Sequence, residues 1–187
     1  MTIRRSSVLF AVSCLLAGAA LAQASAPSEK ACALLQPAEI EAALGAKLAR
    51  PLAGMRVPVK HGAAQPAGEA LWTCEGSVGA RAVTVMYGSE ATAAEANVRG
   101  ATMLGAPRER LRAMGYTVKE TTLGGSTCWT MTPPATHGDE PVAFATVCGG
   151  VKGASFYSVS VSAATAADLL PVEKVKLLAD AAAARLP

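Results

Sequence analysis

The C-terminal half of the chain alternates apolar and polar residues with a period of two. Tyr157, Val159 and Val161 are apolar, and the residues between them are serines. Such alternation is typical of a strand with one face toward the core and one toward water. We therefore predict an antiparallel meander of four strands with one wet face. The predicted strands span 116–123, 126–132, 141–148 and 155–162.

Shorter patterns predict further strands nearer the N-terminus. Residues 69–76 and 81–87 are interpreted as a hairpin, and residues 47–61, which contain two prolines, as a loop or an edge strand. Gly124-Gly125 can supply the positive φ angles of a two-residue hairpin turn. Gly149-Gly150 is also interpreted as a turn, since no helix follows either pair to cradle a phosphate.

Apolar stripes with helical spacing predict three main helical regions. The first spans 37–44, where Pro37 suits the start and Gly45 the residue after the end. The second begins at a capping box, Thr92-Ala-Ala-Glu95, and consists of a helix at 92–104 and a segment at 107–115. The third spans 165–185, with Pro171 in a first turn, and residues 25–30 are interpreted as a short tail.

Together these elements predict an α+β fold with an antiparallel sheet. Residues 25–187 are expected to form a single exported domain, since their number suits one domain. Trp72-Thr-Cys74 echoes Cys128-Trp129-Thr, so the domain can also be divided into two pseudo-repeated halves, 32–88 and 89–187.

The N-terminus has the three parts of a secretory signal peptide. Arg4-Arg5 precedes an apolar run at 8–21, and small residues at Ala20-Leu-Ala22 and Ala22-Gln-Ala24 offer cleavage sites. Residues 1–24 are therefore predicted to direct export and to be cleaved near Ala22 or Ala24. We expect a periplasmic or secreted protein that keeps no stable membrane anchor.

Removing this segment changes the charge balance. The full chain has a formal net charge of +3, from 17 Lys+Arg and 14 Asp+Glu. The mature chain loses two arginines and no acid, so its net charge is 15 minus 14, or +1. A nearly neutral chain gives no electrostatic reason to expect a nucleic-acid partner.

Cys14 leaves with the signal, and the remaining cysteines are Cys32, Cys74, Cys128 and Cys148. Four cysteines allow three pairings. Placing Cys128 opposite Cys148 in a hairpin also brings Trp129 opposite Val147 on one apolar face, so register favours this pair. Cys32–Cys74 then follows by remainder. The chain has no Cys-x-x-Cys pair, which favours structural disulfides over redox or metal chemistry.

Candidate chemistry is sparse. His61 and His137 are the only histidines, both in loops rich in Gly or Pro, and no Gly-x-Ser-x-Gly elbow supplies a nucleophile. No catalytic, cofactor-binding or metal-binding residue is predicted. A basic cluster could face an anionic partner, although a solvated helix face moderated by Glu109 and Glu120 is the preferred interpretation. The cluster consists of Arg99, Arg108, Arg110, Arg112 and Lys119.

Four short motifs carry a resemblance: Cys32-Ala-Leu-Leu, Pro37-Ala-Glu-Ile, Ala43-Leu-Gly45 and Trp72-Thr-Cys74. They resemble the opening of a family of small exported bacterial domains of unknown function, many of them lipoproteins. The resemblance covers mainly residues 32–87. It departs at Gln36, where the family usually has a Thr or Ser cap, and in the missing lipobox. It implies an exported α+β domain with a Cys-tethered first helix, and no activity.

These observations favour an exported, non-catalytic binding or protein-interaction module of the cell envelope. Its partner would be an unknown envelope protein or a small ligand. Two alternatives remain open: a small periplasmic hydrolase that uses His61 or His137, and an inhibitor of another envelope protein.

Overall fold

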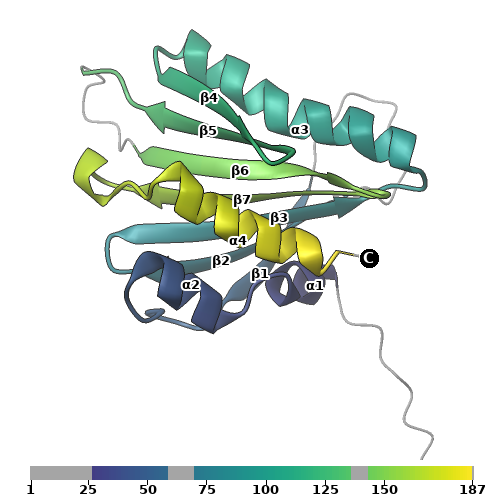
Figure 1. Ribbon diagram of the computed structural model, residues 1–187, viewed down its shortest axis with the longest axis horizontal. Coiled ribbons are helices and arrows are strands. Elements are labelled where there is room, and N and C mark those ends of the chain that lie inside the picture. Colours follow the sequence, from purple (N-terminus) through teal and green to yellow (C-terminus); the bar gives the residue numbers. More distant parts are fainter. Residues whose placement is uncertain (1–26, 59–69, 136–142, 187) are drawn as a thin grey trace, which may run out of the picture.

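The computed structural model describes residues 27–58, 70–135 and 143–186, and has the predicted α+β fold (Figure 1). The α-helices are α1 (Pro27–Ala33), α2 (Pro37–Leu44), α3 (Ala93–Ala113) and α4 (Val172–Ala184), with a 3₁₀ turn at Ala166–Asp168. The strands are β1 (Ala53–Pro58), β2 (Ala70–Val78), β3 (Arg81–Ser89), β4 (Thr117–Leu123), β5 (Ser126–Thr132), β6 (Phe144–Lys152) and β7 (Ser155–Ala163).

All seven strands form one antiparallel sheet in the order β1-β2-β3-β7-β6-β5-β4. The predicted meander supplies four of them, β4 to β7, so the sheet is larger than expected. The remaining three form a second meander, which joins the first where β3 pairs with β7. Identical residues pair at this junction: Val85 lies opposite Val159, and Tyr87 lies opposite Tyr157. Such cross-strand pairs on one face stabilise a sheet.

Helices cover both faces of the sheet. In Figure 1, α4 crosses in front of the middle strands, with α1 and α2 on the same side. The main core lies between these helices and the sheet, and contains Ile40, Val85, Val159, Val175 and Leu178, all buried. On the opposite face, α3 packs on β6 and β7.

The face of the sheet that α3 covers is therefore more buried than the alternating serines suggest. Ser158 is buried, and Ser160 and Ser162 are half-buried. The expectation of one wet face is wrong for this part of the sheet.

The long helix α3 is continuous, which corrects the prediction of two segments. Its start is the predicted capping box: the Glu95 amide donates to Thr92 Oγ1 at 3.2 Å, and the Thr92 amide donates to Glu95 Oε2 at 3.0 Å. It ends at Ala113, and Gly115, whose φ is 85°, follows the C-cap residue Met114. Pro107 lies inside the helix on its exposed side, where the ring does not meet the sheet, and the buried Leu104 keeps the helix packed beside it.

The helices at the two ends also differ from expectation. Residues 27–33, part of which we interpreted as a tail, form α1, so the described residues contain four α-helices where three main helical regions were expected. The amide of Gln36, which replaces the family's usual cap, donates to Glu39 Oε2 at 2.8 Å at the start of α2. The last helix begins after Pro171, and the 3₁₀ turn stands apart from it.

Gly149 and Gly150 lie within β6, so their interpretation as turn residues is wrong. The turn glycine is Gly153, whose φ is 57°. A Cβ at Gly149 would lie 2.4 Å from the Tyr157 carbonyl oxygen and 3.0 Å from Leu104. The strand therefore needs glycine because β7 and α3 approach it closely. Gly124-Gly125 form the predicted hairpin turn, with φ angles of 54° and 85°.

Two glycines of α3 provide a matched test of how closely this helix approaches the sheet. A Cβ at Gly100 would lie 2.6 Å from Val151 Cγ2, whereas one at Gly105 would meet only the end of Arg108, at 3.6 Å. We expect Gly105→Ala to raise the free energy of unfolding by about 0.5–1 kcal/mol through helix propensity. Overpacking should lower the free energy of unfolding of Gly100→Ala by about 1–3 kcal/mol, so this variant should be clearly less stable than Gly105→Ala in urea denaturation. Equal effects would contradict the close contact.

Candidate functional site

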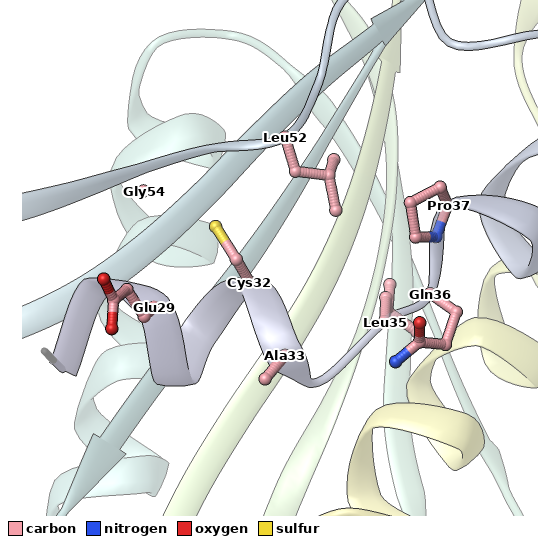
Figure 2. A pocket seen from close by; sticks show the side chains of 8 residues that line it. All are labelled: Glu29, Cys32, Ala33, Leu35, Gln36, Pro37, Leu52 and Gly54. Carbon is pink, nitrogen blue, oxygen red and sulfur yellow. The ribbon is translucent and has the colours of Figure 1, made fainter. Parts of the chain in front are cut away.

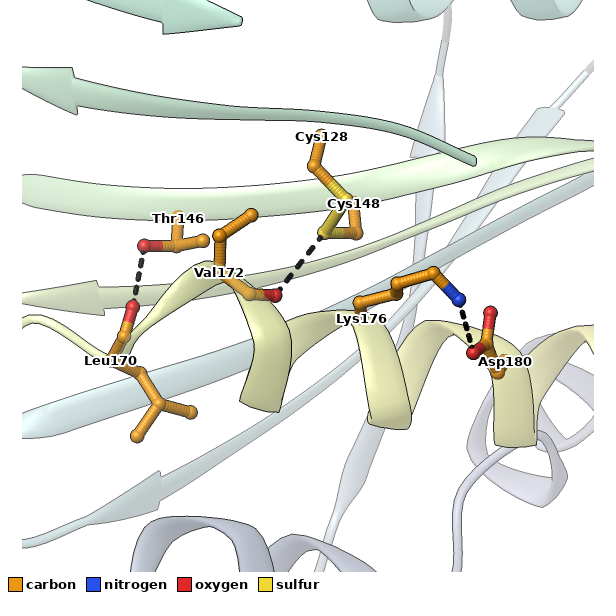
Figure 3. Close-up of a disulfide and its surroundings, with 7 residues drawn as sticks. All are labelled: Cys128, Thr146, Cys148, Leu170, Val172, Lys176 and Asp180. Atoms are coloured by element: carbon orange, nitrogen blue, oxygen red, sulfur yellow. Dashed lines mark hydrogen bonds and ion pairs between the residues drawn. A yellow bond between two sulfur atoms is a disulfide. The ribbon is translucent and has the colours of Figure 1, made fainter. Parts of the chain in front are cut away.

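The structure joins Cys32 to Cys74 and Cys128 to Cys148, the pairing that the register predicts. Cys74, Cys128 and Cys148 lie in one row across the sheet, on the face that α4 covers. Figure 3 shows the Cys128–Cys148 bond beneath the start of α4, where Cys148 Sγ lies 3.8 Å from the Val172 carbonyl oxygen. The first bond instead ties helix α1 to β2 and so fixes the position of that helix.

Thr146 makes a second buried contact below α4. Its Oγ1 donates to the Leu170 carbonyl oxygen at 2.7 Å, as Figure 3 shows. The side chain is fully buried, so this bond satisfies a polar group that would otherwise lose its water partners. It also holds the segment that leads into α4 against the sheet.

The hydrolase alternative depends on the two histidines. His61 and His137 lie outside the described residues. Within the described ranges, no group of three or more His, Cys, Asp or Glu side chains could hold a metal ion. The hydrolase alternative therefore stays a prediction.

The basic cluster is largely neutralised by acidic neighbours. Arg108 and Arg112 of α3 both form ion pairs with Glu120 of β4, and Arg112 also pairs with Glu109. Arg99 Nε lies 3.7 Å from Glu90 Oε1. Glu109 and Glu120 moderate the cluster as predicted, but the face is not fully solvated, because the side chains of Arg99 and Arg108 are only 19% and 18% exposed. The two pairs with Glu120 connect α3 to β4, the outermost strand of the sheet at that edge.

Glu120 is held in its charged form. Its pKa lies below the ordinary value, chiefly because Arg112 donates a hydrogen bond to it; desolvation opposes this shift, and the charge of Arg108 adds to it. The pKa of Arg112 is raised, chiefly by the same hydrogen bond.

This ion pair predicts a loss of stability in acid. The folded state releases the Glu120 proton at lower pH than the unfolded state does, so the unfolded state binds more protons between the two pKa values. The stabilisation is present above the ordinary value of 4.5 and is lost as the pH falls through the folded pKa. The free energy of unfolding can be measured by urea titration at pH 7 and at pH 3.5. It should fall less between these two pH values in Glu120→Gln than in wild type. An unchanged pH dependence in Glu120→Gln would contradict the role of this carboxyl.

The surface features that best suit a binding role lie on either side of α1. An open depression of about 590 Å³ lies between α1, the start of α2 and β1 (Figure 2). Figure 2 shows Cys32 and Leu52 at this depression, with Gln36 and Pro37 at its α2 end. The full lining consists of Glu29, Cys32, Ala33, Leu35, Gln36, Pro37, Leu52 and Gly54.

A second pocket, of about 310 Å³, lies on the other side of α1, and we call it the α1–α4 pocket. It is lined by Lys30, Ala33, Leu34, Tyr87, Arg185 and Leu186. Its size is at the lower end of the range for small-molecule sites, which combine an apolar lining with a few polar groups.

Tyr87, in the floor of the α1–α4 pocket, belongs to a row of aromatic residues. Trp72, Tyr87 and Tyr157 lie opposite one another across β2, β3 and β7. Trp72 and Trp129 both lie close to a disulfide cysteine in the sequence. The structure places them on opposite faces: Trp72 packs against the main core, and Trp129 lies on the α3 side. The predicted internal duplication stays a prediction.

Arg185 connects the elements around the α1–α4 pocket. Its Nη1 donates to the carbonyl oxygens of Leu34 and Ala181, each at 3.1 Å, and its Nη2 donates to Glu39 Oε1 at 2.8 Å. The pKa of Glu39 is lowered, chiefly by this hydrogen bond. Lys152 Nζ supports the same end of α4 by donating to the Ala183 and Leu186 carbonyl oxygens, both at 3.0 Å.

None of the residues that line the α1–α4 pocket was predicted as a site residue. Lys30 and Arg185 stand at opposite ends of the described chain, so their spacing gives no signal.

The comparisons with known proteins bear on the fold. None of the described helices has the length and apolarity that a membrane crossing needs. No family model matches the chain, and no curated protein matches it. The predicted resemblance to small exported domains therefore stays a prediction.

One solved structure provides a comparison of the whole fold. It is the crystal structure of the extracellular domain of PknH from Mycobacterium tuberculosis, with a TM-score of 0.56 and 13% sequence identity. The match covers 84% of this chain and 95% of that chain. At this identity the likeness shows the fold alone: the chain has an α+β fold similar to that of a bacterial extracellular domain.

Proposed function

We propose that this protein is an exported, non-catalytic binding module of the cell envelope. The observation that carries this proposal is the position of α1, which the Cys32–Cys74 bond fastens to the sheet and which has a pocket on each side. A helix fixed in this way holds pocket walls in place before a ligand arrives, which lowers the entropic cost of binding.

Three observations support the exported location. Two disulfides suit an oxidising compartment. The structural neighbour is an extracellular domain. Residues 1–24 have the composition of a signal peptide. Fused to a reporter that is active only outside the cytoplasm, these residues should direct export, and the mature protein should begin near residue 23 or 25. A cytoplasmic protein that retains residue 1 would overturn this part of the proposal.

A substitution at Ala33 tests the binding role. Ala33 is exposed and lines both pockets, so Ala33→Trp should fill them without removing a core contact. Ala38→Trp, on the exposed surface of α2 and outside both linings, is the matched control. Native mass spectrometry of protein recovered from its own envelope should show a bound compound in wild type and Ala38→Trp, and not in Ala33→Trp. Equal occupancy in all three would contradict binding at α1.

The hydrolase alternative has its own test. Wild type, His61→Ala and His137→Ala are assayed on ester, amide and phosphoester substrates. We expect no turnover that depends on either histidine. Turnover that either substitution abolishes would overturn the non-catalytic proposal.

A further inference from the structure

We propose that the α1–α4 pocket binds a small molecule that carries a carboxylate on a compact apolar body. This inference rests on the proposed binding function and names the ligand class for one of its two pockets. Three features of the pocket carry it: an apolar floor, two cations at the rim, and no acidic side chain in its lining.

The floor is apolar and already packed. Leu34, Tyr87 and Leu186 are each more than nine-tenths buried, so the pocket exposes only small parts of large side chains. These side chains come from the residue after α1, from β3 and from the segment just after α4. A floor built from three elements of the core keeps its shape, and an apolar body that covers it is removed from water.

The rim carries positive charge that the described residues leave available. Lys30 is exposed and has no ion-pair or hydrogen-bond partner among the described residues. The ammonium group therefore has all its donors free for a ligand.

Arg185 adds donors whose position is set in advance. Its contacts with Leu34, Ala181 and Glu39 use both hydrogens of Nη1 and one of Nη2. The Nε–H and the second Nη2 hydrogen have no acceptor within the described part of the chain. Glu39 offsets part of the arginine's charge, so Lys30 supplies the net charge and Arg185 supplies directed donors. A carboxylate, which accepts from both kinds of group, suits this pair better than a neutral polar group.

The size of the pocket limits the ligand. A volume of about 310 Å³ lies at the lower end for small-molecule sites, so an aliphatic acid of medium length fits and a protein segment does not.

Isothermal titration calorimetry of the oxidised protein tests the proposal, with decanoate kept below its micelle concentration and 1-decanol as the uncharged probe of equal chain length. Wild type should bind decanoate more tightly than decanol. Lys30→Met should weaken decanoate binding by roughly three- to tenfold and leave decanol binding unchanged. Lys174→Met, which removes the same charge from the exposed side of α4, is the control and should match wild type.

The outcomes separate this inference from the proposed function. Equal affinity for decanoate and decanol, or an equal loss in Lys30→Met and Lys174→Met, would overturn the carboxylate assignment. Either result would leave the binding function standing if the compound recovered from the envelope is still absent from Ala33→Trp, because Ala33 lines both pockets. If Ala33→Trp leaves decanoate binding unchanged, the probe binds elsewhere and the inference is wrong.

Discussion

Replacing Cys32 and Cys74 together by alanine is expected to lower the free energy of unfolding by about 4 kcal/mol. The bond closes a loop with a sequence separation of 42, and the entropy that it removes from the unfolded chain grows with loop length. Since whole domains are stable by only about 5–15 kcal/mol, this loss is a large share.

The bond should also matter locally. Helix α1 has seven residues, too few to be stable by itself in water. Without its link to β2, α1 should exchange its amide hydrogens much faster than α4 does. Both pockets share α1 as a wall, so ligand binding should weaken with it.

The Cys128–Cys148 bond is the natural comparison. Its sequence separation is 20, and it joins strands that already pair residue by residue, so its removal should cost about 3 kcal/mol. Urea denaturation of the two double-alanine variants measures the difference, and the intact mass of wild type should rise by four hydrogens on reduction. If loss of Cys128–Cys148 proved the more damaging, loop length would not be the governing factor. Free thiols in the exported protein would contradict both bonds.

Local patterns predicted the parts of the fold in which neighbours in sequence are neighbours in space. The β5–β6 register could be predicted because one alignment brings Cys128 to Cys148 and Trp129 to Val147 on opposite faces, as the structure shows. The β4–β5 turn could be predicted because few residues other than glycine accept two successive positive φ angles.

Contacts between distant segments could not be predicted in this way. The β3–β7 pairing joins two meanders through residues such as Val85 and Val159, whose apolar character suits many partners. Gly149 resembles a turn residue in the sequence, and only the approach of Tyr157 and Leu104 explains its place within β6. Pro107 was interpreted as a break because a proline removes a helical hydrogen bond. The helix continues because Leu104 is buried before it and Arg108 and Arg112 pair with Glu120 after it.

The candidate site was missed for the same reason. Its cations lie on α1, which is too short for a periodic pattern, and just after α4, whose polar face looks like any solvated surface. Only the fold brings Lys30 and Arg185 to the same pocket.

Replacing Phe156 by alanine is the second large effect that we expect, about 3–5 kcal/mol of lost stability. The side chain is 2% exposed and lies on the face that α3 covers. Its ring lies over Gly88 of β3, which is directly opposite in the sheet, and its Cβ would lie 3.1 Å from a Cβ at Gly100 of α3. Truncation would leave a cavity between a strand and a helix, and these two elements cannot both move to fill it. Phe144→Ala, at the half-buried start of β6, should cost clearly less in the same urea titration.

A size exchange tests whether the ring truly occupies the space above Gly88. A Cβ at Gly88 would lie 2.2 Å from the end of the ring, so Gly88→Ala should destabilise wild type by about 1–3 kcal/mol. In a Phe156→Leu background that end of the ring is absent, and Gly88→Ala should cost much less. Because the two residues are in contact, their effects should be strongly non-additive. Additive effects would mean that Phe156 does not lie on Gly88, and that the register between β3 and β7, on which the joining of the two meanders depends, is different.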